Sequence, residues 1–240
     1  MIPVALVGAG PGDPGLITVR GLELVRSCDV LVYDRLVAPE LVAEAHAGVL
    51  RISRDRLDQD GINALLVAYA RAGLAVVRLK GGDPILFGRG AEEALALSDA
   101  GIPFEIVPGV SSISAVPAAA GIPVTHRGVA SQVTVATGHC PSELDYHALA
   151  CAPGTLVLFM ALGRLDEIAR ELIAHGRAPE TPAAVVSHGT QPSQETVFAP
   201  LVEIADAAAG LEPPALVVVG EVVALAEQLG SSEVRILAAA

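Results

Sequence analysis

The chain has 240 residues, of which 52% are hydrophobic and only 3% aromatic. This composition argues against a disordered chain, which needs low hydrophobicity, and it predicts a core of Ala, Val, Leu and Ile. A formal net charge of −12 argues against nucleic acid as a partner, because nucleic-acid binding needs a basic face.

The sequence gives no sign of a membrane or secreted protein. No apolar run approaches the roughly 18 residues that span a bilayer, and the first residues lack the basic region of a secretory signal. Neither the three cysteines nor the six histidines have metal-ligand spacing, so we expect no metal. We expect a cytoplasmic protein whose cysteines are reduced thiols.

The first half of the chain alternates between predicted strands and predicted helices. Short apolar runs that end in glycine, proline or aspartate predict strands at residues 4–7, 30–33, 49–52, 75–79 and 104–107. Helical spacing predicts helices at residues 17–27, 39–46, 62–72 and 91–100. This alternation predicts a mainly parallel α/β sheet.

A segment rich in Ser, Ala, Gly and Pro at residues 111–123 predicts a domain boundary. We therefore expect an N-terminal α/β domain of residues 1–113 and a C-terminal domain of residues 114–240. The C-terminal domain has one predicted helix, at residues 165–175, and predicted strands at residues 132–137, 155–160, 183–187 and 216–220. It is α/β as well, with either a parallel or a mixed sheet.

A glycine-rich turn follows the first predicted strand, at residues 8–15. Gly8 and Gly10 match a dinucleotide-binding fingerprint, but the sixth position is Asp13, whose carboxylate would oppose a pyrophosphate. Pro11 and Pro14 also obstruct a helix that starts directly after the turn. The dinucleotide interpretation is therefore disfavoured, and a ligand-binding turn and a purely structural turn stay open.

Two further strand ends carry acids. Asp34 and Arg35 follow the second strand, where α/β proteins place their sites, although the two residues could also form a surface ion pair. Gly81, Gly82 and Asp83 follow the fourth strand. Exposed backbone beside a carboxylate suits a ligand with hydroxyl and ammonium groups, such as an adenosyl amino acid, and a tight turn is the alternative.

Small hydroxyl residues and a basic pair complete the motifs. Ser111 and Ser112 follow the fifth strand, and His126 and Arg127 lie in the segment 121–128. His126 alone would more often be a structural histidine, but beside Arg127 it can also bind anionic carboxylates.

In this order and spacing, the motifs resemble the tetrapyrrole methylase family. The opening glycine–proline turn, the Gly81-Gly82-Asp83 turn and the Pro108-Gly109 segment with its serines carry the general resemblance. The segments 33–37, 78–90 and 121–128 are similar, more narrowly, to the uroporphyrinogen-III C-methyltransferases within it. The similarity covers nearly the whole chain.

The resemblance implies two α/β domains with the active site in the cleft between them, and a homodimer. It implies S-adenosylmethionine as the cofactor, bound in a folded conformation by several loops. The cofactor-binding positions that it implies are Pro11, Gly81, Gly82, Asp83, Leu86, Ser111, Ser112, Met160, Gly189 and Ala215.

The activity that the resemblance implies is methylation of uroporphyrinogen III at C2 and C7, giving precorrin-2 for sirohaem or cobalamin biosynthesis. Asp34 matches the family's proposed general base. The substrate carries eight carboxylates, so an acidic protein needs a local positive patch to bind it. Arg35, His126 and Arg127 are the candidates for that patch.

The sequence departs from the family pattern after the third strand, where Arg54 stands about where the family has a lysine proposed as a proton donor. Arginine stays protonated and is a poor general acid. Three interpretations stay open: Arg54 holds a substrate carboxylate while water moves the proton, the lysine is dispensable, or the substrate is a related tetrapyrrole. Another precorrin methylase and a protein that binds both ligands without catalysis are the remaining alternatives.

Overall fold

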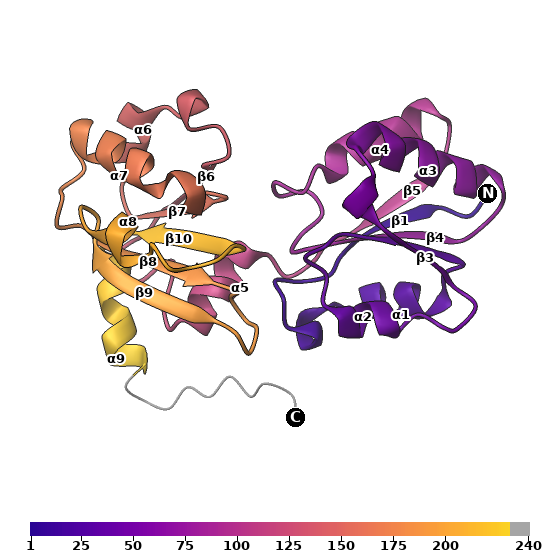
Figure 1. Cartoon of the computed structure of the whole chain (residues 1–240), viewed down its shortest axis with the longest axis horizontal. Helices are drawn as coiled ribbons and strands as arrows, with labels where there is room; N and C mark the ends of the chain where they lie inside the picture. The colour runs from indigo at the N-terminus through magenta and orange to yellow at the C-terminus, as the bar shows by residue number, and fades with distance from the viewer. Residues whose placement is uncertain (231–240) are drawn as a thin grey trace. The chain divides into compact units, whose positions relative to one another are not determined.

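A computed structural model describes residues 1–230 of the chain (Figure 1). The described chain forms two compact units, Met1–Ser111 and a second unit that begins at Ser112. Each unit has its own sheet and its own core, and each is described by itself.

The first unit is built on a five-stranded parallel sheet. Its strand order is β3-β2-β4-β1-β5, and every neighbouring pair is parallel. The strands are β1 (Val4–Gly8), β2 (Val30–Tyr33), β3 (Leu50–Ser53), β4 (Val76–Lys80) and β5 (Phe104–Val107). All five predicted strands of the first half are confirmed to within one residue at each end.

Four helices connect these strands: α1 (Val19–Ser27), α2 (Pro39–Ala43), α3 (Gln59–Arg71) and α4 (Gly90–Asp99). Helix α1 begins two residues later than predicted, because the Thr18 hydroxyl accepts a hydrogen bond from the Gly21 amide (3.1 Å) and so caps the helix. Helix α2 ends at Ala43, three residues earlier than predicted. Short 3-10 turns, η1 (Pro14–Leu16) and η2 (Arg54–Arg56), precede α1 and α3.

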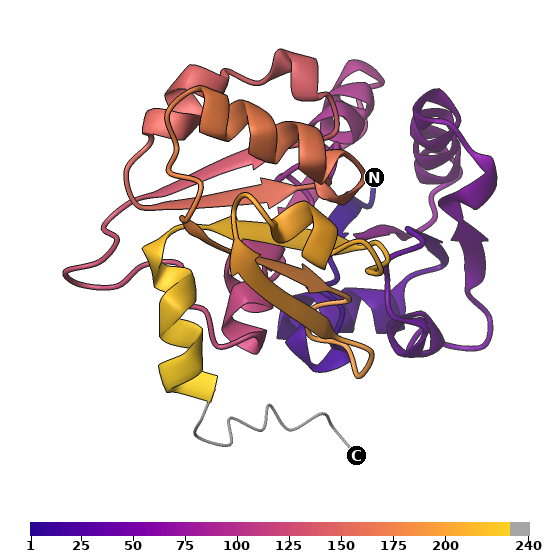
Figure 2. The same cartoon turned by 60° about the vertical axis from the view of Figure 1, so that its left-hand side comes forward.

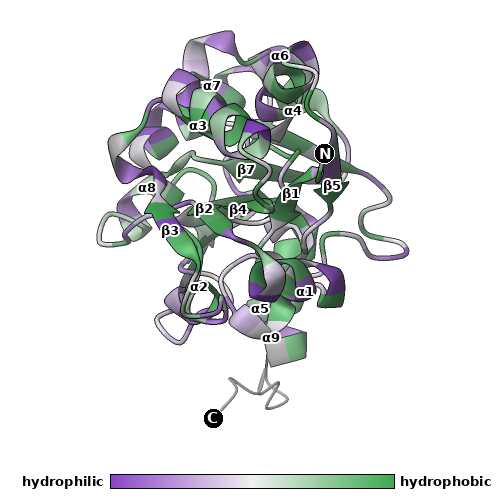
Figure 3. Ribbon diagram, turned by 90° about the vertical axis from the view of Figure 1, so that its right-hand side faces the viewer, coloured by the Kyte–Doolittle hydropathy of each residue, from purple (hydrophilic) through white to green (hydrophobic). Residues whose placement is uncertain are grey.

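The two faces of this sheet are covered by different helices (Figure 1). Val7, Leu31 and Leu79 face one core, with Val25 of α1 and Leu41 of α2. Alternate strand residues face the second core, where α3 and α4 pack. Figure 3 shows hydrophobic colour concentrated on the strands, whereas the helices carry both hydrophobic and hydrophilic colour. Burial on both faces explains why the strands read as continuous apolar runs.

The second unit contains a mixed five-stranded sheet. Its strand order is β6-β7-β10-β8-β9, in which β6 and β7 are parallel and the other pairs are antiparallel. The strands are β6 (Val133–Thr137), β7 (Thr155–Phe159), β8 (Pro182–Ser187), β9 (Glu195–Pro200) and β10 (Ala215–Val219). The helices are α5 (Ser112–Ala119), α6 (Tyr146–Cys151), α7 (Leu165–Ala174), α8 (Ile204–Ala207) and α9 (Ala226–Gly230), with 3-10 turns η3 (Pro141–Glu143), η4 (Leu162–Arg164) and η5 (Glu221–Leu225).

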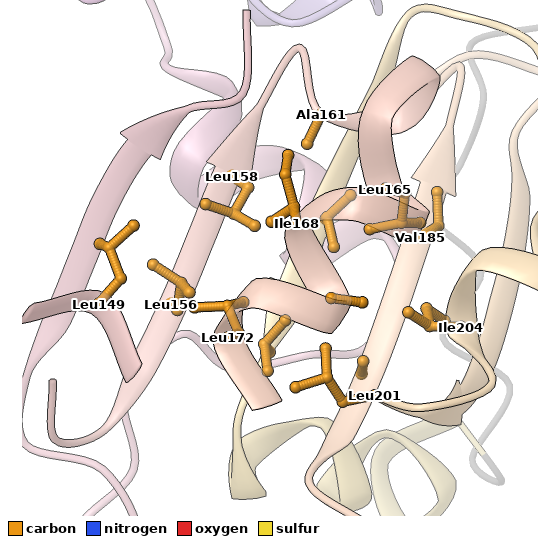
Figure 4. Packing of buried hydrophobic residues seen from close by; sticks show 14 of the residues in the cluster. Leu149, Leu156, Leu158, Ala161, Leu165, Ile168, Leu172, Val185, Leu201 and Ile204 are labelled. Carbon is orange, nitrogen blue, oxygen red and sulfur yellow. The ribbon is translucent and has the colours of Figure 1, made fainter. Parts of the chain in front are cut away.

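Helix α7 supplies the main contact of one core in this unit. Leu165, Ile168 and Leu172 lie three and four residues apart, so they share one face of the helix. In Figure 4, Ile168 and Leu172 lie beside Leu158 and Leu156 of β7, and Leu165 lies beside Val185 of β8. In Figure 2, α7 (orange) lies on one side of the sheet and α9 (yellow) on the other, in agreement with two separate cores.

Among residues 1–230, no helix is long and apolar enough to cross a membrane. In the same part of the chain, His, Cys, Asp and Glu side chains do not gather in groups of three or more that could hold a metal ion.

The three cysteines differ in their environment, which gives a labelling prediction. Cys28 is buried and Cys140 and Cys151 are exposed; none forms a disulfide. Burial, as the largest cause, raises the pKa of the Cys28 thiol to about 11. The Cys28 thiol is both shielded from solvent and further from ionisation, so at pH 8 we expect a thiol reagent to modify only the two exposed cysteines in the native protein. All three should react in denaturant, and rapid native modification of Cys28 would contradict this assignment.

Candidate active site

The carboxyl ends of the parallel strands in the first unit carry most of the predicted site residues. Asp34 directly follows β2, and Arg54 directly follows β3. The segment 81–83 follows β4, and Gly109 lies two residues beyond β5. Because the strands are parallel, these ends meet at one edge of the sheet, where ligands bind in open α/β proteins.

The turns after β1 and β4 are joined by backbone hydrogen bonds. The Gly82 amide donates to the Gly10 carbonyl (2.7 Å), and the Gly10 amide donates to the Gly82 carbonyl (3.2 Å). The Ala9 amide donates to the Lys80 carbonyl (2.7 Å). The glycine turn is followed by the 3-10 turn η1, so α1 does not start directly after it. This arrangement differs from a dinucleotide-binding turn, in which the helix begins at the glycines.

Glycine is required where three of these turns approach one another. A Cβ atom on Gly109 would lie 2.2 Å from the Gly82 carbonyl oxygen and 2.7 Å from the Gly8 Cα atom. A Cβ atom on Gly8 would lie 2.5 Å from the Gly109 Cα atom. The obstructing atoms are backbone atoms, so a side chain here would displace the strand ends themselves.

We therefore expect Gly109→Ala to lower the free energy of unfolding by about 1–3 kcal/mol, because overpacking forces the backbone to shift. Gly210→Ala is the matched control, since nothing lies within 4 Å of a Cβ atom built there. Its effect should stay within about 0.5 kcal/mol. Urea denaturation measures both variants, and equal stability of the two would contradict the close approach of the three turns.

Asp83 shapes the turn in which it lies. Its Oδ1 atom accepts hydrogen bonds from the amides of Ile85 (2.9 Å) and Leu86 (3.3 Å), and its Oδ2 atom accepts one from the Gly109 amide (3.2 Å). The carboxylate thus ties the turn after β4 to the turn after β5. A carboxylate has about four acceptor positions, so this role leaves acceptor capacity for a ligand.

The two residues predicted to be catalytic lie together. The Arg54 Nη1 atom is 3.7 Å from the Asp34 Oδ1 atom, and the Asp34 side chain is 17% exposed. The backbone amide of Asp34 donates to the Leu79 carbonyl (3.1 Å), which fixes the start of the turn. The predicted substrate residue Arg35 is the next residue along and is exposed.

Sequence reasoning missed the residue that holds Asp34 most closely. The Arg78 Nη2 atom donates to the Asp34 Oδ1 atom (2.5 Å), while its Nε atom donates to the Glu93 Oε1 atom (3.0 Å). The Lys80 Nζ atom donates to the same Glu93 oxygen (2.9 Å). Arg78, Lys80 and Glu93 are all fully buried. Asp34 therefore belongs to a network of four charged side chains that reaches from the sheet edge into the core.

A sequence signal for this network does exist. Arg78 and Lys80 alternate with apolar residues in β4, so they share one face of a strand that is buried on both faces. A buried cation needs an anionic partner. Glu93 lies on the buried side of α4, together with Gly90 and Ala94. Identifying Glu93 as that partner requires knowing that α4 packs on this face of the sheet.

The environment of Lys80 lowers its pKa. Burial is the largest cause, followed by repulsion from the Arg78 guanidinium, and attraction to Glu93 opposes both. Lys80 is the single lysine of the chain, and it contacts the carboxylate that also holds Arg78.

In the second unit, strained backbone marks the ends of β7 and β8. Met160, His188 and Thr190 have φ angles of 51°, 47° and 69°. Residues other than glycine are uncommon at positive φ, and such strain gathers at functional sites. Gly189 lies between two of them, and a Cβ atom there would lie 2.5 Å from the Val116 Cγ1 atom.

Of the predicted cofactor residues in this unit, Gly189 and Ala215 lie on adjacent chain segments. Ala215 pairs with Ser187 at the start of β10, and the His188 amide donates to the Pro214 carbonyl (2.8 Å). Met160 directly follows β7, the other neighbour of β10 in the sheet, and its side chain is 50% exposed. Ser112 is the first residue of α5.

The remaining predicted site residues lie in turns. Pro11 is half-buried in the turn after β1, and Ser111 is the last residue of the first unit. His126 and Arg127 are exposed in a tight turn, which two backbone hydrogen bonds of 2.9 Å between His126 and Ala130 close. This turn presents both basic side chains to solvent.

Fold and site together define a two-unit α/β protein with its candidate site at the carboxyl ends of the parallel strands. The family model described as Tetrapyrrole (Corrin/Porphyrin) Methylases matches residues 3–205. The chain belongs to the tetrapyrrole methylase family, as the motifs predict.

Curated relatives are siroheme synthases. The chain is 47% identical over 235 residues to siroheme synthase 1 of Yersinia enterocolitica, covering 94% of this chain and 50% of the relative. It is 48% identical over 238 residues to the siroheme synthase of Acinetobacter baylyi, covering 94% of this chain and 52% of the relative. The chain thus spans about half the length of the curated relatives it matches.

Solved structures extend the comparison to the fold. The uroporphyrin-III C-methyl transferase of Thermus thermophilus, complexed with S-adenyl homocysteine, is 41% identical, with a TM-score of 0.82 over 93% of this chain and 99% of that chain. A cobalt precorrin-4 methyltransferase is 30% identical, with a TM-score of 0.86 over 92% of this chain and 95% of that chain.

Proposed function

We propose that the protein is a C-methyltransferase that uses S-adenosylmethionine to convert uroporphyrinogen III to precorrin-2, by methylation at C2 and C7. The observation that carries the proposal is the Asp34 carboxylate, held at the sheet edge by Arg78 and Arg54 beside glycine turns. Likeness to the Thermus thermophilus methyltransferase along nearly the whole chain supports it. The siroheme synthase relatives support a role in sirohaem formation.

In the proposed reaction, Asp34 acts as the general base. In each methyl transfer, a nucleophilic pyrrole carbon would form a bond to the methyl carbon as the sulfur–methyl bond breaks and S-adenosylhomocysteine leaves, and the macrocycle would then lose a proton. Arg78 and Arg54 both contact the Oδ1 atom of Asp34. Among residues 1–230, the Oδ2 atom has no hydrogen-bond donor, so it is the atom that we propose accepts the proton.

The cofactor supplies the electrophilic methyl group when it is bound. Most of the residues that we propose hold it lie in turns and at strand ends that contain glycine, whose missing side chain lets a ligand approach the backbone closely. The amides and carbonyls of these turns would bind and orient the cofactor, and half-buried Leu86 and exposed Met160 offer apolar contacts. The proposed residues are Pro11, Gly81, Gly82, Asp83, Leu86, Ser111, Ser112, Met160, Gly189 and Ala215.

The charges at the site suit an anionic substrate. Arg78 and Lys80 balance Asp34 and Glu93, which leaves the charge of Arg54 in excess. The Arg54 side chain is 34% exposed, so it can reach a ligand. Guanidinium groups bind carboxylates through paired hydrogen bonds. We propose that Arg54 holds a substrate carboxylate, together with Arg35, His126 and Arg127.

This role of Arg54 gives a kinetic prediction. Arg54→Ala should raise the KM for the tetrapyrrole about tenfold to a hundredfold, because a charge-assisted hydrogen bond contributes about 1.5–3 kcal/mol. The binding constant for S-adenosylmethionine should not change. Arg71→Ala, at an exposed arginine of α3, is the control. An unchanged KM in Arg54→Ala would remove the carboxylate-holding role.

The proposed function is tested by counting methyl groups. The full chain is incubated anaerobically with uroporphyrinogen III and S-adenosylmethionine, and the tetrapyrrole is examined by mass spectrometry. We expect two methyl groups per macrocycle. Binding of both ligands without any methyl transfer would reject the proposed activity and support a binding protein.

A second candidate is methylation of a later, already methylated tetrapyrrole. The TM-score of 0.86 to a cobalt precorrin-4 methyltransferase favours it, although the identity is lower, at 30%. In the same assay, methyl transfer to an already methylated precorrin but not to uroporphyrinogen III would select this candidate.

We also propose a homodimer, which light scattering would detect as about twice the chain mass of 24.4 kDa. A stable monomer at micromolar concentration would contradict this proposal.

We propose a cytoplasmic location on the ground that the three cysteines are free thiols.

A further inference from the structure

Three of the charged side chains near Asp34 are completely removed from solvent. Arg78, Lys80 and Glu93 have no exposed side-chain surface, whereas Asp34 retains 17%. A buried ion costs several kcal/mol unless it is paired, so an unbalanced set would be strongly destabilising. The set is balanced, because two cations face two carboxylates.

The hydrogen bonds connect these charges in one line. Glu93 Oε1 accepts from Lys80 Nζ (2.9 Å) and from Arg78 Nε (3.0 Å), and Arg78 Nη2 then donates to Asp34. Arg78 Nη1 donates to the Leu79 carbonyl (3.2 Å). The Arg78 guanidinium thus donates to three groups, which are the Asp34 carboxylate, the Glu93 carboxylate and the Leu79 carbonyl. Apart from Asp34, only Glu93 among these three acceptors carries a charge.

Helix α3 supports the same carboxylate. The Gln59 Nε2 atom lies 3.4 Å from Glu93 Oε1 and 3.1 Å from the Asn63 Oδ1 atom. Glu93 is therefore the point where β4, α3 and α4 meet through polar contacts. It does not contact Asp34 directly, so any influence on that carboxylate passes through Arg78.

From this connectivity we propose that Glu93 is a positioning residue for the methyl transfer, with Lys80 as its counter-charge. Through Arg78, the pair fixes the orientation of the Asp34 carboxylate and sets how readily it takes up a proton. The inference rests on the proposed function, in which Asp34 is the general base, and it adds two residues that have no contact with Asp34 or with solvent.

The charges that surround Asp34 define the direction of the expected effects. They are Arg78 and Lys80 on β4, Arg54 on η2, Glu93 on α4 and the neighbouring Arg35. Loss of the negative charge of Glu93 leaves an excess of positive charge, which favours the ionised form of Asp34. Loss of the positive charge of Lys80 favours the protonated form of Asp34.

The test uses Glu93→Gln, Lys80→Met and the double variant in the full chain. The pH at which the Asp34 carboxyl signal titrates is followed by carbon-13 NMR without substrate, with Asp34→Asn identifying the signal. We expect a shift of about 0.5–1 pH unit downward in Glu93→Gln and upward in Lys80→Met. The double variant should return close to wild type, because its net charge is restored. The acid limb of the pH–rate profile should move in the same directions.

Leu97→Ala is the control for a merely structural effect. Leu97 is buried on the same helix and its side chain is apolar, so this variant should lose stability without moving either titration. If Glu93→Gln does not fold, the upward shift of the Asp34 titration in Lys80→Met still tests the inference. Shifts of the same sign in both single variants, or no shift, would overturn the inference. The two single variants could shift the titration in opposite directions while the wild-type protein transfers no methyl group. That result would reject the proposed function but support the charge network.

Discussion

Asp34→Asn is expected to reduce the rate of methyl transfer about a hundredfold to ten-thousandfold, which is the usual contribution of a positioned general base. An amide of the same shape can still accept a hydrogen bond from Arg78, but it cannot take up a proton from the macrocycle. The binding constant for S-adenosylmethionine should therefore stay within about twofold of wild type, as measured by calorimetry.

Asp99→Asn is the matched control, since Asp99 is an exposed acid at the end of α4. It should retain full activity. Retention of wild-type activity by Asp34→Asn, with the fold intact, would show that Asp34 is not the base. An equal loss in Asp99→Asn would show that the assay reports a general effect of charge.

Arg78→Met is expected to lower the free energy of unfolding by about 3–5 kcal/mol, because removal of one partner leaves a buried charge uncompensated. Among the described side chains, Glu93 would keep Lys80 as its one cationic partner, and Asp34 would keep the more distant Arg54. Methyl transfer at low temperature should fall as well, because Asp34 would no longer be oriented.

Arg26→Met provides the comparison, since Arg26 pairs with Glu44 on the surface and its side chain is 56% exposed. Exposed ion pairs contribute about 0–1 kcal/mol, so this variant should be nearly as stable as wild type. Denaturant unfolding curves measure both variants. A loss of less than about 1 kcal/mol in Arg78→Met would contradict the description of the network as a buried, balanced set.

The strands of the parallel sheet could be predicted because each is buried on both faces and so appears as an apolar run closed by Gly, Pro or Asp. The same signal fails for β9. This strand lies at the edge of its sheet, its Phe198 is exposed, and Pro200 ends it, so neither an apolar run nor a clear alternation marks it. Helix α5 was missed because its small residues and Pro117 are typical of a linker.

For the candidate site, motif order predicted Asp34 and Arg54, whose side chains lie 3.7 Å apart in the structure. The sequence could not identify Glu93, because its link to Arg78 depends on how α4 packs across the sheet, 15 positions further along the chain. Nor could it predict that Asp83 holds the turn before Leu86 and the Gly109 amide together. Sequence motifs thus identify the strand ends and the acidic residues that follow them, whereas tertiary packing determines which charged side chains form ion pairs.

The most direct test of the proposed function is to locate the transferred methyl groups. The protein is supplied with uroporphyrinogen III and S-adenosylmethionine labelled with carbon-13 in the methyl group, and the product is examined by NMR without exposure to oxygen. The proposed function predicts two labelled methyl groups, at C2 and C7. Label at any other carbon, on an oxygen or nitrogen atom, or absent from the macrocycle would contradict it.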